Sequence, residues 1–143
     1  MAYWLFQANP QHHRIFDAIH DLDEMPWLVT RYRHQIQPDD GVLIWIAGEQ
    51  AGIYAIATVL SIPEIVRPED IADIEYWTNP SRVRTTKART NISFVRKLLR
   101  QPLRKHEIRF DRILRDLPVI QTPGSTNFKI SDEQWLRVYQ LKG

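Results

Sequence analysis

The stretch from Gly41 to Ser61 is rich in apolar residues and predicts a β-hairpin. Its first part, GVLIWI, places apolar side chains on both faces of a strand, with Trp45 on the face opposite the valine and isoleucines. Gly48 and Gly52 bound a short turn, and a second β-rich run follows it. Strands that are apolar on both faces are covered on both sides, so we expect this hairpin at the centre of a sheet.

The remaining patterns predict short strands and helices on both sides of the hairpin. Alternating apolar positions predict strands at Tyr3–Ala8, Thr90–Leu99 and around Phe128–Ile130. Helices are predicted from Asn9-Pro10 to Asp23, in two pieces between Arg104 and Leu117, and after Ser131. Ser131 forms a capping box with Gln134. The last helix is expected to bury Trp135, Val138 and Tyr139. Connecting segments are expected at Glu24–Val29, Ile62–Asp73 and Ser81–Arg89, and a helical turn at Thr30–Gln37. This order predicts one α+β domain over residues 1–143, built around a curved sheet.

The charges divide the chain into an acidic and a basic part. Residues 1–75 hold 12 Asp and Glu against four Lys and Arg, whereas residues 82–115 hold 12 Lys and Arg against two acidic residues. A basic block of this kind favours a polyanion such as nucleic acid as the partner, and a solvated face with scattered ion pairs is the alternative. The sequence has no long apolar run and no signal-peptide pattern, which predicts a cytoplasmic protein that does not enter a membrane.

Few residues are arranged for metal binding or catalysis. The chain has no cysteine, which excludes disulfides and thiolate ligands, and it has no G-x-S-x-G, P-loop or G-x-G-x-x-G motif. Asp39 and Asp40 are adjacent carboxylates, but their place before Gly41 predicts a turn. We therefore predict no metal and no cofactor, and these residues give little support for nucleophilic catalysis. The histidines lack a metal-binding spacing, and they are His12, His13, His20, His34 and His106.

The five tryptophans are a large number for 143 residues. Trp135 lies on the apolar face of the last predicted helix and is expected in the core. Trp27 follows a proline in an irregular segment, where a buried structural tryptophan is less expected. Indoles from separate segments could converge on one cavity, which would suit a flat or methylated ring because each stacked base contributes about 1–3 kcal/mol. For each tryptophan, the alternative is a role as core filler.

Several motifs, taken together, resemble the EVE domain family. They are YWLFQANP at residues 3–10, the lone Trp27, VLIWIAGEQAGI at residues 42–53, and GSTNFKIS at residues 124–131 followed by EQW. The resemblance extends over about residues 2–140, and Asp39-Asp40-Gly41 departs from the Gly-Asp expected before the strand. It implies a PUA-like fold, related to the YTH and ASCH domains, with a twisted barrel-like sheet flanked by helices. It also implies a module that binds modified nucleobases and is not an enzyme.

The resemblance further implies an aromatic cage with polar residues beside it. Trp27 matches the first cage tryptophan, and Trp45 is expected to line the wall of the same pocket. Gln7 and Asn9 end the first strand and could hydrogen-bond to a base edge, although Asn9 has an alternative role as a helix cap.

Three more positions belong to this expected pocket. The second cage aromatic falls in the strand at residues 91–98, where Phe94 is available and Val95 is the neighbouring possibility. Trp77 is an alternative wall residue. Asn127 belongs to a family motif and is expected either in the pocket or in a structural role.

The ligand implied is nucleic acid that carries a modified base, either a modified cytosine in DNA or a methylated base in RNA. Its flanking phosphates would be held by the basic residues, with contacts that are independent of sequence and sensitive to salt. The residues expected to hold phosphates are Arg82, Arg84, Lys87, Arg89, Arg96 and Lys97.

Two other functions compete with this prediction. One is an adaptor that contacts a restriction or RNA-processing protein through its surface. The other is a small-molecule hydrolase or transferase that uses the same pocket, with Asp39, Asp40 or a histidine as the reactive group.

Overall fold

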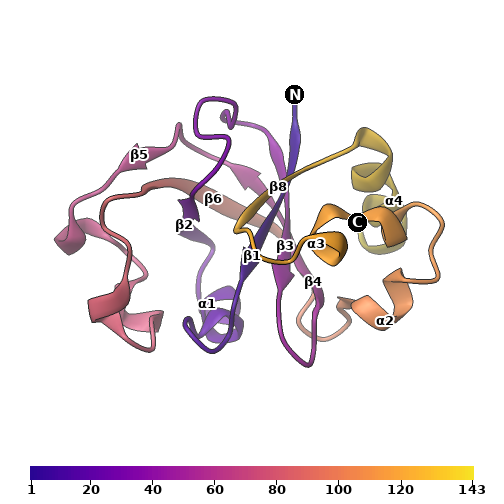
Figure 1. Ribbon diagram of the computed structural model, residues 1–143, viewed down its shortest axis with the longest axis horizontal. Coiled ribbons are helices and arrows are strands. Elements are labelled where there is room, and N and C mark those ends of the chain that lie inside the picture. Colours follow the sequence, from indigo (N-terminus) through magenta and orange to yellow (C-terminus); the bar gives the residue numbers. More distant parts are fainter.

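The computed structural model describes residues 1–143 and contains one mixed β-sheet (Figure 1). The main path of the sheet runs in the order β2 (Glu24–Val29), β6 (Ala88–Lys97), β4 (Gly52–Val59), β3 (Gly41–Ile46), β1 (Tyr3–Ala8) and β8 (Asn127–Ile130). Two-residue strands, β5 (Glu64–Ile65) and β7 (Leu103–Arg104), pair with β6 and β4. The predicted hairpin is confirmed as β3 and β4 in the middle of this path, and every residue of β3 is buried.

The helices are short and lie on both sides of the sheet in Figure 1. The capping box predicted for the last helix is confirmed, because Ser131 Oγ accepts from the Gln134 N–H at 3.1 Å and Gln134 Oε1 accepts from the Ser131 N–H at 3.0 Å. The α-helices are α1 (Ile15–Asp21), α2 (Lys105–Ile108), α3 (Pro118–Gln121) and α4 (Asp132–Lys142), and the 3-10 helices are η1 (Pro68–Asp70), η2 (Ile74–Tyr76), η3 (Pro80–Arg82) and η4 (Leu114–Asp116).

Two predicted elements near the N-terminus are wrong. The first helix begins at Ile15 and not at Asn9, because residues 9–14 are held in a turn by a distant segment. The Arg14 N–H donates to the Tyr76 carbonyl at 2.7 Å, and His13 forms a β-bridge with Trp77. These long-range contacts override the capping signal of the Asn-Pro pair.

The expected connector at residues 24–29 is strand β2. It pairs antiparallel with β6, and Pro26 lies opposite Asn91. β2 is the last strand of the main path, and an edge strand tolerates a proline because one side needs no backbone donor. Likewise, β6 begins at Ala88, so Arg89 belongs to a strand and not to the predicted surface loop.

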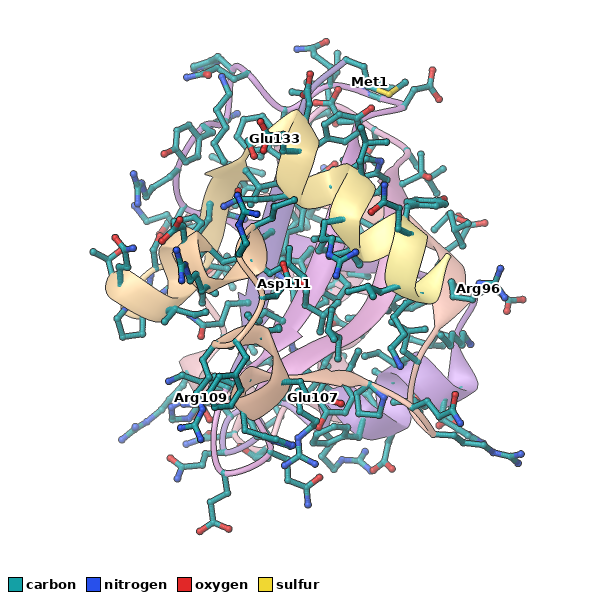
Figure 2. All side chains as sticks on the ribbon, turned by 90° about the vertical axis from the view of Figure 1, so that its right-hand side faces the viewer. Met1, Arg96, Glu107, Arg109, Asp111 and Glu133 are labelled. Carbon is teal, nitrogen blue, oxygen red and sulfur yellow. The ribbon has the colours of Figure 1, made fainter.

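The sheet has an apolar core on each face. The first core lies under α1 and includes Phe6, Ile19 and Trp27, whereas the second lies under the C-terminal helices and includes Trp45 and Val138. Figure 2 shows α2 and α4 in front of the strands on this second face. In the predicted core face of the last helix, Val138 is fully buried and Trp135 is half-buried, but Tyr139 is 39% exposed.

The sheet curls so that strands far apart on its path meet. Phe6 of β1 and Trp27 of β2 are separated by three strands along the path, yet their ring centroids lie 6.2 Å apart. Asn127 at the start of β8 accepts from the Thr30 N–H at 2.8 Å and donates to the Leu28 carbonyl at 3.1 Å. The predicted curved mixed sheet is therefore confirmed as a half-barrel, tied together between β8 and the end of β2.

Candidate functional site

A cavity of about 350 Å³ lies beside this junction, where β1 ends and β2 runs past it. Its walls come from residues 7–9, 12, 13 and 15, from residues 25–28 of β2, from Thr126, and from part of the segment at residues 73–84. The volume is within the range of small-ligand pockets, which runs from about 300 to 1,000 Å³.

One wall of the cavity is apolar. Met25, Trp27 and Ile15 line it and belong to the first core. Trp27 is only 5% exposed and packs on Phe6 with an angle of 30° between the ring planes. An indole held in this way is a rigid surface on which a flat ligand can stack.

Another wall of the cavity is polar and contains a buried pair of ionisable side chains. His13 Nε2 and Asp73 Oδ2 lie 2.8 Å apart, and the two residues are 5% and 3% exposed. Trp77 stands edge-on to the His13 ring, with centroids 5.0 Å apart. Three buried polar atoms of this wall have no hydrogen-bond partner in the protein: His13 Nδ1, Asp73 Oδ1 and Trp77 Nε1.

This wall is held in place by hydrogen bonds between two distant segments. The Thr78 N–H donates to the His12 carbonyl at 3.0 Å, and Tyr76 donates its hydroxyl to Asp21 Oδ2 at 2.9 Å. The bond to Asp21 is the main cause that raises the pKa of Tyr76. The pKa of Asp21 is lowered, first by its hydrogen bond with His20 and then by the one from Tyr76. These hydrogen bonds fix the position of the wall.

The comparisons with known proteins identify the family of this fold. The model of the EVE domain matches residues 2–141. The chain belongs to the EVE domain family. No match is found among curated proteins.

Solved structures show the same fold. A hypothetical protein from Leishmania major is 16% identical with a TM-score of 0.75, and the match covers 99% of this chain and 94% of that one. A protein from Pseudomonas putida is 21% identical with a TM-score of 0.70, covering 98% and 99% of the two chains. Human THYN1, solved in complex with DNA that contains 5-methylcytosine, is 10% identical with a TM-score of 0.73, covering 99% and 97%. The predicted PUA-like fold is confirmed.

Three of the expected base-binding residues of this EVE domain line the cavity. They are Trp27, Gln7 and Asn9. Gln7 donates its amide to the carbonyls of Pro123 and Ser125 at 2.8 and 2.7 Å, which leaves Oε1 as an acceptor. Asn9 Oδ1 accepts from the Gln11 N–H at 2.9 Å, so this side chain supports a turn rather than a helix.

The other three expected pocket residues do not line the cavity. Trp45 lies on the outer face of the sheet in the second core, so its expected place on the wall is wrong. Alternation along β3 separates Trp45 from the inward-facing Ile44 and Ile46. Phe94 packs against the first core and lies under the Lys97 ammonium, 5.6 Å from it. Asn127 is fully buried and uses both ends of its amide to join the strands.

The expected phosphate-binding residues also separate into groups. Arg82 and Arg84 line the cavity, and exposed Lys87 follows them outside the lining. Arg89 is 4% exposed and donates to the Arg84 carbonyl at 2.7 Å, so the expected phosphate contact is wrong for this residue. Burial lowers the pKa of Arg89, and the charge of Asp73 opposes this shift.

Arg96 and Lys97 lie at the far end of β6, away from Arg84. Lys97 Nζ donates to the Leu22 carbonyl at 2.6 Å, at the C-terminal end of α1. Figure 2 shows Arg96 reaching out from the edge of the molecule. Neither residue lines the cavity.

Asp40 has a structural role, as its place in the predicted turn indicates. Its carboxylate is 3% exposed and accepts hydrogen bonds from Trp4 Nε1, the Gln37 N–H and the Ala2 N–H at 2.8 to 3.1 Å. Asp39 adopts a positive φ of 74°, which is typical of a turn. Neither carboxylate lines the cavity.

The sequence missed His13 and Asp73 as a pair. The two residues are 60 positions apart, so no local spacing connects them. The chain contains no group of three or more His, Cys, Asp or Glu residues that could hold a metal ion. None of its helices has both the length and the apolar character needed to cross a membrane.

Proposed function

We propose that this EVE domain binds a modified nucleobase, taken out of the stack of a nucleic acid, in the cavity beside Trp27. The observation that carries the proposal is the combination of a rigid indole, unpartnered polar atoms and two arginines around one cavity. The structure of human THYN1 with DNA that contains 5-methylcytosine supports a modified cytosine in DNA as the ligand. A methylated base in RNA is the second ligand to test.

The free-energy cost of extruding a base can be offset by contacts in the cavity. Extruding a base from a duplex costs a few kcal/mol, and the cost is smaller from a single strand. Stacking on an aromatic side chain returns about 1–3 kcal/mol per base. Hydrogen bonds from a buried polar wall would supply the rest, together with phosphate contacts by Arg82 and Arg84 at the rim.

The first test is a binding panel of short labelled strands, measured by fluorescence anisotropy at one salt concentration. The strands carry cytosine, 5-methylcytosine, 5-hydroxymethylcytosine or N6-methyladenine at one position, as DNA and as RNA. We expect one modified strand to bind selectively, and Trp27→Ala to weaken this binding about 5- to 150-fold because the stacking surface is lost.

The matched control is Trp45→Phe, since Trp45 is buried to a similar degree on the other face of the sheet. This variant should retain the selectivity of the wild type. Equal and weak binding of every strand would contradict the proposal and would leave only a basic surface. In that case an adaptor that contacts a restriction or RNA-processing protein becomes the better explanation.

A further inference from the structure

We infer that Asp73 and Trp77 recognise the pairing edge of the bound base and select a base that carries, on this edge, an exocyclic amino group next to an unprotonated ring nitrogen. The inference rests on the proposed function and adds the residues and the chemical class that set its specificity. It concerns the polar wall of the cavity, where Asp73, Trp77 and His13 lie together.

The evidence is a concentration of unpaired polar atoms. Buried polar side-chain atoms in folded proteins nearly always have a hydrogen-bond partner. This chain has five that do not, and three of them belong to residues of this one wall: Asp73 Oδ1, Trp77 Nε1 and His13 Nδ1. A ligand that supplied their partners would remove an unfavourable feature of the free protein.

The chemistry of these atoms restricts the ligand. An ionised carboxylate only accepts hydrogen bonds, so His13 Nε2 donates to Asp73 Oδ2 and Oδ1 is left as a second acceptor. The indole Nε1 of Trp77 only donates. The wall therefore contains one fixed acceptor, Asp73 Oδ1, and one fixed donor, Trp77 Nε1. His13 orients the acceptor, and its own Nδ1 is a further acceptor when the ring is neutral.

Only some bases match this pattern. Cytosine and adenine carry an amino donor beside a ring-nitrogen acceptor on their pairing edge. Thymine, uracil and guanine carry a carbonyl acceptor beside a ring N–H donor, so a base bound in the same register would place acceptor against carboxylate and donor against indole N–H. A site built for one hydrogen-bond pattern rejects the opposite pattern strongly, because its buried groups are then left unpaired.

Thymine is the sharpest comparison, since it has the same ring size and the same methyl group as 5-methylcytosine and differs only on this edge. Single strands are used so that no base pair has to be broken, which would otherwise differ between the two bases. We expect the wild type to bind the 5-methylcytosine strand about 10- to 100-fold more tightly than the thymine strand. A strand with 5-methyl-2-pyrimidinone, which lacks the amino group but keeps the ring-nitrogen acceptor, should bind more weakly than 5-methylcytosine and more tightly than thymine. N6-methyladenine tests the larger ring.

Two variants assign the recognition to residues. In Asp73→Asn the amide oxygen can accept from His13 while its NH₂ group faces the ligand, so the preference for 5-methylcytosine over thymine should disappear or reverse. Trp77→Phe keeps an aromatic ring but removes the N–H, and should weaken 5-methylcytosine binding about 3- to 10-fold. The controls are Asp116→Asn, at an exposed carboxylate, and Trp135→Phe, at an indole outside the cavity.

The outcomes separate this inference from the proposed function. If 5-methylcytosine and thymine bind equally and both depend on Trp27, base binding stands and the inference is overturned. If Asp73→Asn folds and keeps the preference of the wild type, the assignment to Asp73 is overturned. If no modified strand binds better than its unmodified counterpart, the proposed function itself fails. If Asp73→Asn does not fold, the comparison of 5-methylcytosine with thymine in the wild type and in Trp77→Phe still tests the inference.

Discussion

Asn127 connects the two ends of the curved sheet through a single side chain. Its Oδ1 accepts from the Thr30 N–H and its Nδ2 donates to the Leu28 carbonyl, and the side chain is fully buried. Leu28 and the neighbouring Trp27 line the cavity. Asn127 thus acts on the cavity indirectly, by fixing the strand that carries the indole.

We predict that Asn127→Ala lowers the free energy of unfolding by about 2–4 kcal/mol, because two partly buried backbone groups lose their partners and a fully buried side chain is truncated. Urea denaturation measures this change. The control is Asn91→Ala, at an exposed position of β6, which should change stability by less than about 0.5 kcal/mol. A small effect of Asn127→Ala, similar to that of the control, would show that the sheet does not depend on this junction.

Helix α4 is attached to the rest of the protein by an ion pair as well as by its apolar face. Arg137 Nε donates to Asp111 Oδ2 at 2.8 Å, and Figure 2 shows Asp111 between α2 and α4. Burial raises the pKa of Asp111, but hydrogen bonds from the Leu114 N–H, the Arg137 side chain and the Ile113 N–H outweigh it and lower the pKa overall. The ionised form is therefore the one that the folded protein stabilises.

This shift gives stability a defined pH dependence. The pKa of Asp111 is lower in the folded than in the unfolded state. Its contribution to the free energy of unfolding is therefore complete above the unfolded-state pKa of about 3.9 and is lost as the pH falls through the folded-state pKa. At pH 6, Asp111→Asn should lower the free energy of unfolding by about 1–3 kcal/mol.

Chemical denaturation of the wild type and Asp111→Asn between pH 6 and pH 3 measures this dependence. The difference between the two proteins should shrink below about pH 4, and Asp116→Asn should leave the profile of the wild type unchanged. A constant difference across this range would mean that the carboxylate is not stabilised by its partners.

Local patterns predicted the parts of the fold that depend on neighbouring residues. The hairpin of β3 and β4 follows from apolar positions and its glycine-bounded turn, and α4 follows from the capping box at Ser131. Strand β2 did not follow from its own sequence. It contains Pro26, and its extended form depends on pairing with β6, whose paired residues lie 59 to 69 positions further along the chain.

The cavity was predictable only in part for the same reason. Trp27, Gln7 and Asn9 lie in motifs that the family resemblance selects, and all three line it. The pairing of His13 with Asp73 arises only when the segment at residues 73–84 folds back against the start of α1. The alternation of β3 places Trp45 and Ile44 on opposite faces of the sheet, but it does not indicate which face contains the cavity.

Two groups of basic residues lie at opposite ends of strand β6. Arg82 and Arg84 precede β6, and Arg96 lies near its far end. β6 has ten residues and is therefore roughly 30 Å long. A phosphate that flanks a base in the cavity would be within reach of the first group and not of the second.

This separation predicts how binding to a modified single strand responds to salt. Each lost phosphate contact reduces the slope of log K against log salt by about 0.7, so replacing both Arg82 and Arg84 by Gln should reduce it by about 1.4 and weaken binding at low salt. Arg96→Gln removes one positive charge from an exposed position and should leave the slope unchanged. Binding titrations at four salt concentrations between about 50 and 200 mM measure the slope for both variants. An equal effect of Arg96→Gln would mean that the nucleic acid follows the basic surface as a whole, and the rim of the cavity would then have no special part in holding the backbone.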